Sequence, residues 1–382
     1  MKELEIYIHI PFCARKCNYC DFLSFPSGGM PQRAYVDRLK EEITKASVLF
    51  PEHEVTSVFI GGGTPSILEA ELIGELMDCV RESYRMISDA EITIEVNPGS
   101  TLRHKFARYR EAGVNRLSIG LQSADNGELR VLGRIHTFEE FLKCYQGARM
   151  EGFDNINVDL INCFPTQTAA SWKKTLKNVL MLKPEHVSVY NLQLEEGTPF
   201  CDLVARGELS LPSEEEAAAM DAVTKELMTA YKFLRYEISN YAKEGRECRH
   251  NKGYWTGKDY IGFGLGASSY VNGTRFKNTA VFEDYLKTGF TELSWEEYVK
   301  GKQSVETLPE REKMREFMIL GLRLTKGVGS IDFYRRFGLQ LDDVYGNIID
   351  RYTARGLLER DGYDVRLTER GMELANTVMS EF

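Results

Sequence analysis

The stretch YIHIPFCARKCNYCDF, residues 7–22, decides the fold. Its first residues continue an alternating strand pattern over 4–10, and Cys13, Cys17 and Cys20 follow at once in a C-x3-C-x2-C spacing. Three thiolates this close together are suited to three irons of a 4Fe–4S cubane. Phe22 stands where a fourth cysteine would be expected, so one iron would keep an open position for a small molecule. The stretch therefore predicts a cluster on a loop directly after a strand.

A structural zinc site is the alternative use of these cysteines. Zinc would need a fourth ligand, for which His9 is the nearest candidate in the sequence. Structural zinc sites normally use paired C-x2-4-C knuckles, and this loop offers only one group of three cysteines. The spacing favours the cluster but leaves zinc open at this point.

Composition limits the classes of protein that this chain can be. Its 382 residues suffice for a large barrel and an appendage, and a net charge of −9 disfavours nucleic acid as a partner. The sequence starts without a signal-peptide pattern and contains no apolar run long enough to span a bilayer. We therefore expect a cytoplasmic protein, in which the other five cysteines stay reduced and form no disulfide framework.

Strand-like and helical segments alternate over residues 1–200. Helical spacing of charged and apolar residues is seen over 34–49 and 138–150. Such alternation is typical of βαβ units around a parallel sheet. The sequence predicts an α/β fold whose first domain, 1–200, is a partial parallel (β/α)6 barrel, with strands at 4–10, 55–60, 91–96, 116–121, 155–161 and 186–192.

Two further regions are expected after the barrel. Residues 201–307 combine a helix at 213–231 with a β-rich region, in which Asn272-Gly273 predicts a two-residue hairpin turn. Residues 308–382 predict three helices, two strands joined at Asp361-Gly362 and a final helix, a winged-helix-like α+β domain. Residues 310–382 contain 12 Lys and Arg against 13 Asp and Glu, which favours a packing role over DNA binding.

Polar and glycine residues gather where the predicted barrel strands end. Gly61-Gly62-Gly63-Thr64 follows the second strand, and glycines let a backbone approach a ligand closely. Glu95 places a carboxylate near the end of the third predicted strand, 91–96. Side chains at this end of barrel strands are often ligand contacts, although an ordinary turn or a salt bridge would explain any one of them. The remaining candidates at strand ends are Gln122, Arg134 and Asp159.

Several longer segments together resemble the oxygen-independent coproporphyrinogen III oxidase-like radical S-adenosylmethionine (SAM) family. They run in order over essentially the whole chain: residues 7–22, GGGTPS (61–66), EVNP (95–98), RLSIGLQS (116–123), LGRIH (132–136), NVDLINCFPTQT (157–168), LGLRLTKGV (320–328) and LTERG (367–371). The resemblance implies a radical SAM barrel, in which an electron from an external donor passes through the cluster and cleaves SAM. It also implies that SAM is contacted by Tyr7, Gly62, Gly63, Thr64, Glu95, Gln122, Arg134 and Asp159.

Three features resemble the heme chaperone branch of this family more than its oxidases. The oxidases carry a further cysteine where this chain has Phe22, and a longer segment before the cluster than the twelve residues that precede Cys13 here. The segment 249–255, RHNKGYW, resembles an H-N-x-x-Y-W motif that is associated with heme in the chaperone branch. Imidazole is a common axial ligand of heme iron, so His250 is the candidate ligand and Cys248 its rival.

The resemblance thus implies a cytoplasmic heme chaperone that associates peripherally with the membrane. Its cofactors would be a 4Fe–4S cluster, SAM and heme. Its partners would be heme-acceptor proteins, with membrane-bound respiratory enzymes as candidates, and a homodimer is left open. The alternative activity is that of an oxygen-independent coproporphyrinogen III oxidase, an enzyme of porphyrin biosynthesis.

Overall fold

Six parallel strands form the centre of the fold in the computed structural model, which describes residues 1–100, 103–287, 289 and 294–382. All six predicted strands are present and lie side by side in sequence order. Their bounds are β1 (Lys2–Ile10), β4 (His53–Gly62), β5 (Met86–Val96), β6 (Arg116–Gln122), β7 (Ile156–Asn162) and β8 (His186–Asn191). Helices separate these strands along the chain, as the alternating pattern predicts.

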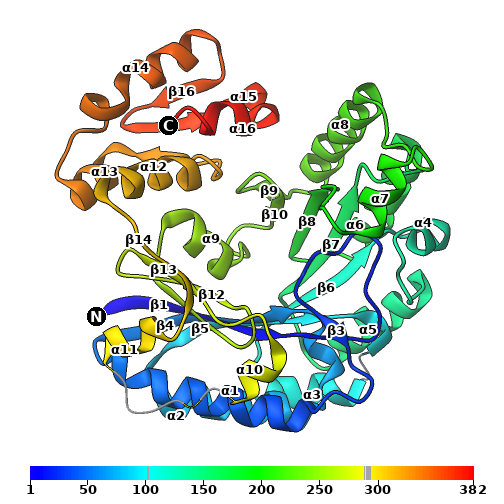
Figure 1. The fold of residues 1–382 in the computed structure, drawn as a ribbon. Helices are drawn as coiled ribbons and strands as arrows, with labels where there is room; N and C mark the ends of the chain where they lie inside the picture. Colours follow the sequence, from blue (N-terminus) through cyan, green and yellow to red (C-terminus); the bar gives the residue numbers. More distant parts are fainter. Residues whose placement is uncertain (101–102, 288, 290–293) are drawn as a thin grey trace.

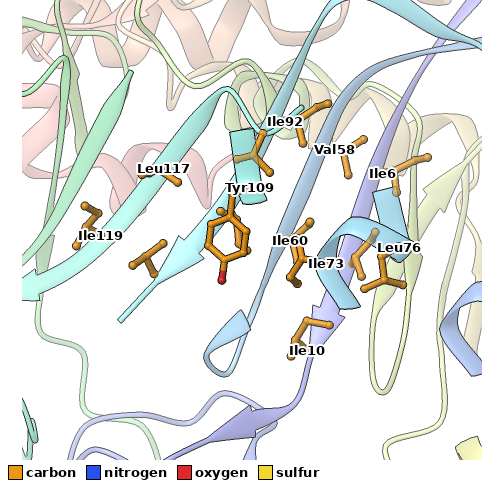
Figure 2. Close-up of a cluster of buried hydrophobic side chains, with 14 of the residues drawn as sticks. Ile6, Ile10, Val58, Ile60, Ile73, Leu76, Ile92, Tyr109, Leu117 and Ile119 are labelled. Atoms are coloured by element: carbon orange, nitrogen blue, oxygen red, sulfur yellow. The ribbon is translucent and has the colours of Figure 1, made fainter. Parts of the chain in front are cut away.

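Strand β1 shows how the sequence sorts its side chains between the two faces of the sheet. Successive residues of a strand point to opposite faces, so the apolar side chains of Leu4, Ile6, Ile8 and Ile10 share one face. All four are fully buried. Figure 2 shows Ile6 and Ile10 with Ile73 and Leu76 of α2 (Ala70–Ser83) in the core between sheet and helices. The other face of β1 carries polar residues, and that face is directed away from these helices.

The helices that follow the strands cover the apolar face. In Figure 1, α1, α2 and α3 lie together beneath β1, β4 and β5. The predicted helix at 34–49 is present as α1 with a short 3-10 extension at Ser47–Leu49, and the one at 138–150 is present as α5. The bounds are α1 (Gln32–Ala46), α3 (Arg103–Glu111), α4 (Asn126–Val131), α5 (Phe138–Met150), α6 (Ala169–Met181), α7 (Pro199–Ala205) and α8 (Glu214–Ala230).

The sheet extends beyond the six predicted strands at both sides. On one side β11 (Tyr260–Phe263) pairs parallel with β1, so a seventh parallel strand joins the barrel from a region expected only to be β-rich. On the other side β10 (Asn240–Ala242) and β9 (Leu234–Arg235) continue antiparallel from β8. The partner of β11 lies more than 250 residues earlier in the chain, which is why a local pattern does not reveal the pairing.

The predicted hairpin at Asn272-Gly273 is confirmed. β12 (Ser268–Val271) and β13 (Thr274–Lys277) are antiparallel, and Val271 faces Thr274 across the turn. Asn272 and Gly273 have φ of 50° and 77°, the left-handed values that a tight type I′ turn requires. β14 (Gln303–Thr307) pairs with β13 and ends the sheet on this side.

The C-terminal region has the predicted arrangement of helices and a two-stranded wing. Its helices are α12 (Glu310–Gly321), α13 (Ser330–Phe337) and α14 (Leu341–Ala354), followed by the hairpin β16 (Leu358–Asp361) and β17 (Asp364–Leu367). The short strand β15 (Val328–Gly329) adds to β17, and the final helix is divided into α15 (Glu369–Glu373) and α16 (Ala375–Met379). These elements share a core of their own. The domain boundaries at 200/201 and 307/308 stay a prediction.

Helix α9 (Arg249–Thr256) lies between the sheet and the C-terminal helices, as Figure 1 shows. It contacts both strand β4 and helix α12. This helix contains the whole H-N-x-x-Y-W segment, so that motif sits at the junction of two parts of the fold.

Candidate functional site

The three cysteines lie on one loop beyond the end of β1. Cys13 is buried in the short strand β2 (Phe12–Cys13), and Cys17 and Cys20 are half-buried. The loop is held by Asn18, whose side-chain amide donates to the Val131 carbonyl at 2.9 Å. All three cysteines line one cavity of about 400 Å³, which we call the cluster cavity. The loop therefore presents all three thiols to a single cavity.

Two of the cysteine sulfurs accept hydrogen bonds from side chains of other elements. The Thr64 hydroxyl donates to Cys13 Sγ at 3.5 Å, and Arg134 Nη1 donates to Cys17 Sγ at 3.6 Å. Donors aimed at sulfur stabilise the thiolate form that binds iron, and a guanidinium adds positive charge. Burial raises the pKa of the Cys20 thiol to about 11 in the absence of metal.

Most of the predicted SAM residues line this cluster cavity. The structure brings together seven of the eight from five different segments, four at or near the carboxyl ends of parallel strands and one, Arg134, in the loop after α4. They are Gly62, Gly63, Thr64, Glu95, Gln122, Arg134 and Asp159, with Gly63 adjoining the Cys13 sulfur. Tyr7 does not line this cavity but its neighbour, described below.

Gly62 and Glu95 form the edge of the cluster cavity. The backbone N–H of Gly62 donates to Glu95 Oε2 at 3.0 Å, and Gly62 has a φ of +111°, which favours glycine. Burial, and then the charge of Asp159, raise the pKa of Glu95 to about 8, although the Gly62 hydrogen bond opposes them. Near neutral pH this carboxyl therefore retains a proton that it can donate to a ligand.

Gln122, at the end of β6, and Arg134, in the loop between α4 and α5, supply the next polar atoms of the wall. Gln122 has a left-handed φ of 67° at the end of β6, and Arg134 Nη2 donates to the Gly120 carbonyl at 3.0 Å. Two buried atoms here, Gln122 Oε1 and Arg134 Nε, have no hydrogen-bond partner among the described residues. Buried polar atoms without a partner are costly, so a polar ligand in the cavity would relieve both.

Asp159 is held in place by its neighbours on β6 and β7. Ser118 Oγ donates to one carboxylate oxygen at 2.8 Å, and Asn157 Nδ2 donates to the other at 2.8 Å. Asn157 Oδ1 in turn accepts a hydrogen bond from His186 Nδ1 at 2.6 Å. This second layer of contacts fixes the orientation of the carboxylate that faces the cavity.

The residues present fit a 4Fe–4S cluster with SAM. In such a cluster each thiolate binds a different iron, so three sulfurs need to share a cavity and need not converge on one ion. In the parts of the chain that the structure describes, no three His, Cys, Asp or Glu side chains are arranged to hold a single metal ion. Close-approach glycines, thiols and the two unpartnered polar atoms border the same space.

A second cavity of about 540 Å³ adjoins the first, and we call it the aromatic cavity. The two cavities share Phe22, Gly62 and Glu95 in their walls. Tyr7 lines the aromatic cavity and its hydroxyl is bonded to His9 Nδ1 at 3.0 Å, while His9 Nε2 donates to the Leu23 carbonyl at 2.8 Å. Both ring nitrogens of His9 thus have hydrogen-bond partners, and the ring lines the aromatic cavity. It does not line the cluster cavity in which the three cysteines meet.

His250 lies beneath the aromatic cavity and not in its wall. Its side chain is 1% exposed, with Nδ1 bonded to Ser57 Oγ and Nε2 bonded to the Tyr254 hydroxyl, each at 2.8 Å. Burial, and then the charge of Arg116, lower the pKa of His250 to about 3, so the ring is neutral. Both ring nitrogens have partners in this structure, and direct contact between His250 and heme stays a prediction.

The rival ligand Cys248 is also withdrawn from both cavities. Its side chain is fully buried, and its thiol donates to Glu91 Oε1 at 3.4 Å. Within the H-N-x-x-Y-W motif, Tyr254 and Trp255 are the residues that line the aromatic cavity. The aromatic pair is thus the part of the motif that a ligand would meet.

Several cavity residues were missed by reasoning from the sequence. Tyr190 and Asn191 end β8 in the wall of the cluster cavity, and their position at a strand end could have revealed them. Lys313 and Arg336 line the aromatic cavity from the C-terminal domain. Nothing near them in the sequence indicates a site, because their neighbours in space lie far away along the chain.

Two family models match segments of the chain. Residues 7–179 match the radical SAM superfamily, and residues 308–374 match the HemN C-terminal domain. The described residues contain no helix whose length and apolar character would let it cross a bilayer.

Relatives match over nearly the full length of the chain. A heme chaperone HemW of Bacillus subtilis is 36% identical over 98% of this chain and 98% of its own. The heme chaperone HemW of Escherichia coli is 34% identical over 100% of this chain and 98% of its own. The mitochondrial radical S-adenosyl methionine domain-containing protein 1 of Danio rerio is 31% identical over 99% of this chain and 86% of its own.

Among solved structures, the radical SAM enzyme coproporphyrinogen III oxidase (HemN) of Escherichia coli has the same fold. It superposes with a TM-score of 0.84 at 24% identity, over 99% of this chain and 89% of that one. The predicted α/β radical SAM fold with its C-terminal domain is therefore confirmed. Because the matches to the chaperones extend over the whole chain, this chain belongs to the heme chaperone HemW family of the radical SAM superfamily.

Proposed function

We propose that this protein is a heme chaperone, which binds heme and transfers it to acceptor proteins. The observation that carries the proposal is the similarity of the whole chain to relatives named heme chaperone HemW, at 36% identity over 98% of both chains. A partial match, confined to the barrel, would have supported only the superfamily. Here the α9 segment and the C-terminal domain are included in the match.

The proposed cofactors are a 4Fe–4S cluster on Cys13, Cys17 and Cys20 and a SAM molecule beside it in the cluster cavity. When bound, the reduced cluster supplies an electron that cleaves a carbon–sulfur bond of SAM. Thr64 and Arg134 would hold the thiolates through their hydrogen bonds to sulfur.

We assign SAM binding to the strand-end residues and derive a role for each from its contacts. Gly62 and Gly63 line the cavity without side chains and would let the ligand approach the backbone. Glu95, protonated near neutral pH, would donate a hydrogen bond, and the fixed carboxylate of Asp159 would accept one. The remaining proposed contacts are Gln122, Arg134 and, from the adjoining wall, Tyr7.

The partners are heme and the proteins that receive it. We propose membrane-bound respiratory enzymes as acceptors. This protein would be cytoplasmic and would contact them at the membrane surface. A separate electron donor would reduce the cluster, and a homodimer is a further proposal. These proposals rest on the family resemblance of the motifs and not on contacts of this chain.

A transfer assay tests the proposed function. The protein, reconstituted with iron and sulfide without oxygen and loaded with heme, is mixed with an apo-cytochrome whose absorption spectrum differs from that of the loaded protein. We expect the rate of heme transfer from this protein to the acceptor to exceed the rate of transfer from heme-loaded serum albumin at the same concentration. Transfer no faster than from albumin would mean passive release and would contradict a chaperone function.

A further inference from the structure

The aromatic cavity has the size and walls of a site for a flat organic ligand. Its volume of about 540 Å³ falls in the range of sites that hold cofactor-sized molecules. Tyr254 and Trp255 of α9, Tyr260 of β11 and Phe317 of α12 contribute aromatic rings to its wall. Tyr254 is fixed edge-on against Tyr260 at a centroid distance of 4.7 Å and an angle of 83°. Rigid aromatic walls of this kind favour a planar, apolar ring system.

Charge in the wall favours an anion. Of the described lining residues, Lys258, Arg275, Lys313 and Arg336 are cations, whereas only Glu95 and Glu316 carry carboxyl groups. This excess of positive charge occurs in a chain whose net charge is −9, so it is local. A ligand with a planar apolar ring and negative groups at its edge would match both features.

Two of the cations form short ion pairs with carboxylates. Arg275 forms a bidentate pair with Glu316 at 2.6 and 2.9 Å, and Lys258 pairs with Glu3 at 2.6 Å. These pairs would have to break before either cation could bind a ligand carboxylate. They are therefore poor candidates for anion binding.

The other two cations, both from the C-terminal domain, are better placed to bind a carboxylate. Arg336 of α13 donates to the backbone carbonyls of Thr256 and Gly257 at 3.4 and 3.2 Å, which are neutral acceptors at the end of α9. Lys313 of α12 pairs at 3.0 Å with Glu310, whose side chain is 69% exposed. Surface pairs contribute little, and a carboxylate is a stronger acceptor than a carbonyl.

We propose that heme binds in the aromatic cavity, with its porphyrin ring against Tyr254 and Trp255 and its two propionates at Lys313 and Arg336. The proposal rests on the heme chaperone function inferred above. It makes the C-terminal domain a part of the heme site, which binds the acidic edge of the molecule while α9 binds its face. The shared wall at Phe22, Gly62 and Glu95 places this site beside the cluster cavity.

His250 then acts as a positioning residue. Its Nε2 is bonded to the Tyr254 hydroxyl and its Nδ1 to Ser57, so it ties one cavity wall to strand β4. Glu5 Oε2 lies 3.7 Å from the same Nδ1. The motif thereby divides into a buried anchor, His250, and a half-buried aromatic pair that lines the cavity.

A heme titration followed by absorbance tests the location. The variants are Lys313→Gln/Arg336→Gln and a matched control, Lys326→Gln/Arg370→Gln, which removes two charges from exposed positions of the same domain outside both cavities. Each full-length, cluster-loaded protein is titrated with heme and with heme dimethyl ester in the same detergent-containing buffer. The ester keeps the ring but lacks the two carboxylates. Circular dichroism and iron content check that every variant is folded and loaded.

The expected result is a rise of roughly tenfold or more in the Kd for heme in the Lys313/Arg336 variant, because two charge-assisted contacts are lost. Its Kd for the ester and both Kd values of the control variant should match the unsubstituted protein. Equal heme affinity of the two variants, or an equal loss for heme and ester, would overturn the proposed location. A failure of the unsubstituted protein to bind any heme would instead overturn the proposed function.

Discussion

Replacing Gly62 by Ala should destabilise the fold and weaken ligand binding in the cluster cavity. Substitutions at two other glycines serve as controls that separate backbone strain from side-chain overlap. Gly62 has a φ of +111°, and an L-residue forced into positive φ costs about 1–2 kcal/mol. Its Cβ would lie 2.5 Å from Cε1 and Nδ1 of His9. The His9 ring cannot turn away freely, because both of its nitrogens are hydrogen-bonded. Overpacking of this kind costs about 1–3 kcal/mol, so the total loss should be roughly 2–5 kcal/mol.

The controls isolate each contribution. Gly152 has a φ of +84° with no atom within 4 Å of its would-be Cβ, so Gly152→Ala should cost only the backbone strain. Gly74 lies within helix α2, also in open space and without a positive φ, so Gly74→Ala should stabilise by about 0.5–1 kcal/mol. Urea unfolding of the cluster-free proteins, followed by circular dichroism, measures all three changes.

The same substitution should also weaken SAM binding, since Gly62 donates to Glu95 and lines both cavities. Equilibrium dialysis with SAM on the reconstituted proteins provides this second measurement. The reasoning is refuted if Gly62→Ala and Gly152→Ala lose the same stability to within about 0.5 kcal/mol and bind SAM equally well, because contact with His9 would then cost nothing.

The remaining predictions concern the cluster, SAM, the buried carboxyl of Glu5 and His250. Replacing Cys13, Cys17 and Cys20 together by Ala should abolish the iron and acid-labile sulfide of the reconstituted protein, whereas Cys79→Ala should leave both unchanged; zinc without sulfide in the unsubstituted protein would defeat the assignment. SAM should perturb the EPR spectrum of the reduced cluster, and Glu95→Ala should weaken that effect without loss of iron; a spectrum indifferent to SAM would exclude the open iron. Burial raises the pKa of Glu5 to about 9, so folding is favoured at low pH and loses stability as pH rises from its unfolded pKa of 4.5 through 9. Glu5→Gln should remove this loss and stabilise the protein on the order of 3 kcal/mol at pH 7 and little at pH 4, in contrast to Glu52→Gln at an exposed site; equal gains at both pH values would argue against it. His250→Ala should raise the Kd for heme as Tyr254→Phe does, without changing the absorption spectrum of the bound heme, whereas a shifted spectrum would make His250 an axial ligand.

The central strands could be predicted because their signals are local. Each of the six has an apolar alternation of its own, followed by a helical segment, and the chain order of such units already determines a parallel sheet. The hairpin at Asn272-Gly273 is equally local, since two adjacent residues carry the positive φ values. The pairing of β11 with β1 was missed because the two strands lie far apart in the sequence. The residue pattern within each strand does not indicate which other strand it pairs with.

The candidate site shows the same division. The cysteine spacing and the strand-end residues could be read from short segments, and the structure gathers nearly all of them around one cavity. The surroundings of His250 could be foreseen only in part: Tyr254 follows at the helical spacing of four residues, but Ser57 is 193 residues away. The positive charges at the aromatic cavity could not be foreseen, because Lys313 and Arg336 reach it through the packing of the C-terminal domain on α9.

The most direct test of the heme chaperone function offers the protein both molecules side by side. The reconstituted protein is incubated without oxygen, with SAM and a reductant, either with heme or with coproporphyrinogen III. Bound heme is measured by absorbance, and CO2, methionine and 5′-deoxyadenosine are measured in the second reaction. We expect stoichiometric heme binding and no conversion of coproporphyrinogen III. Release of CO2 in proportion to methionine and 5′-deoxyadenosine, without heme binding, would contradict the account and identify an oxidase instead.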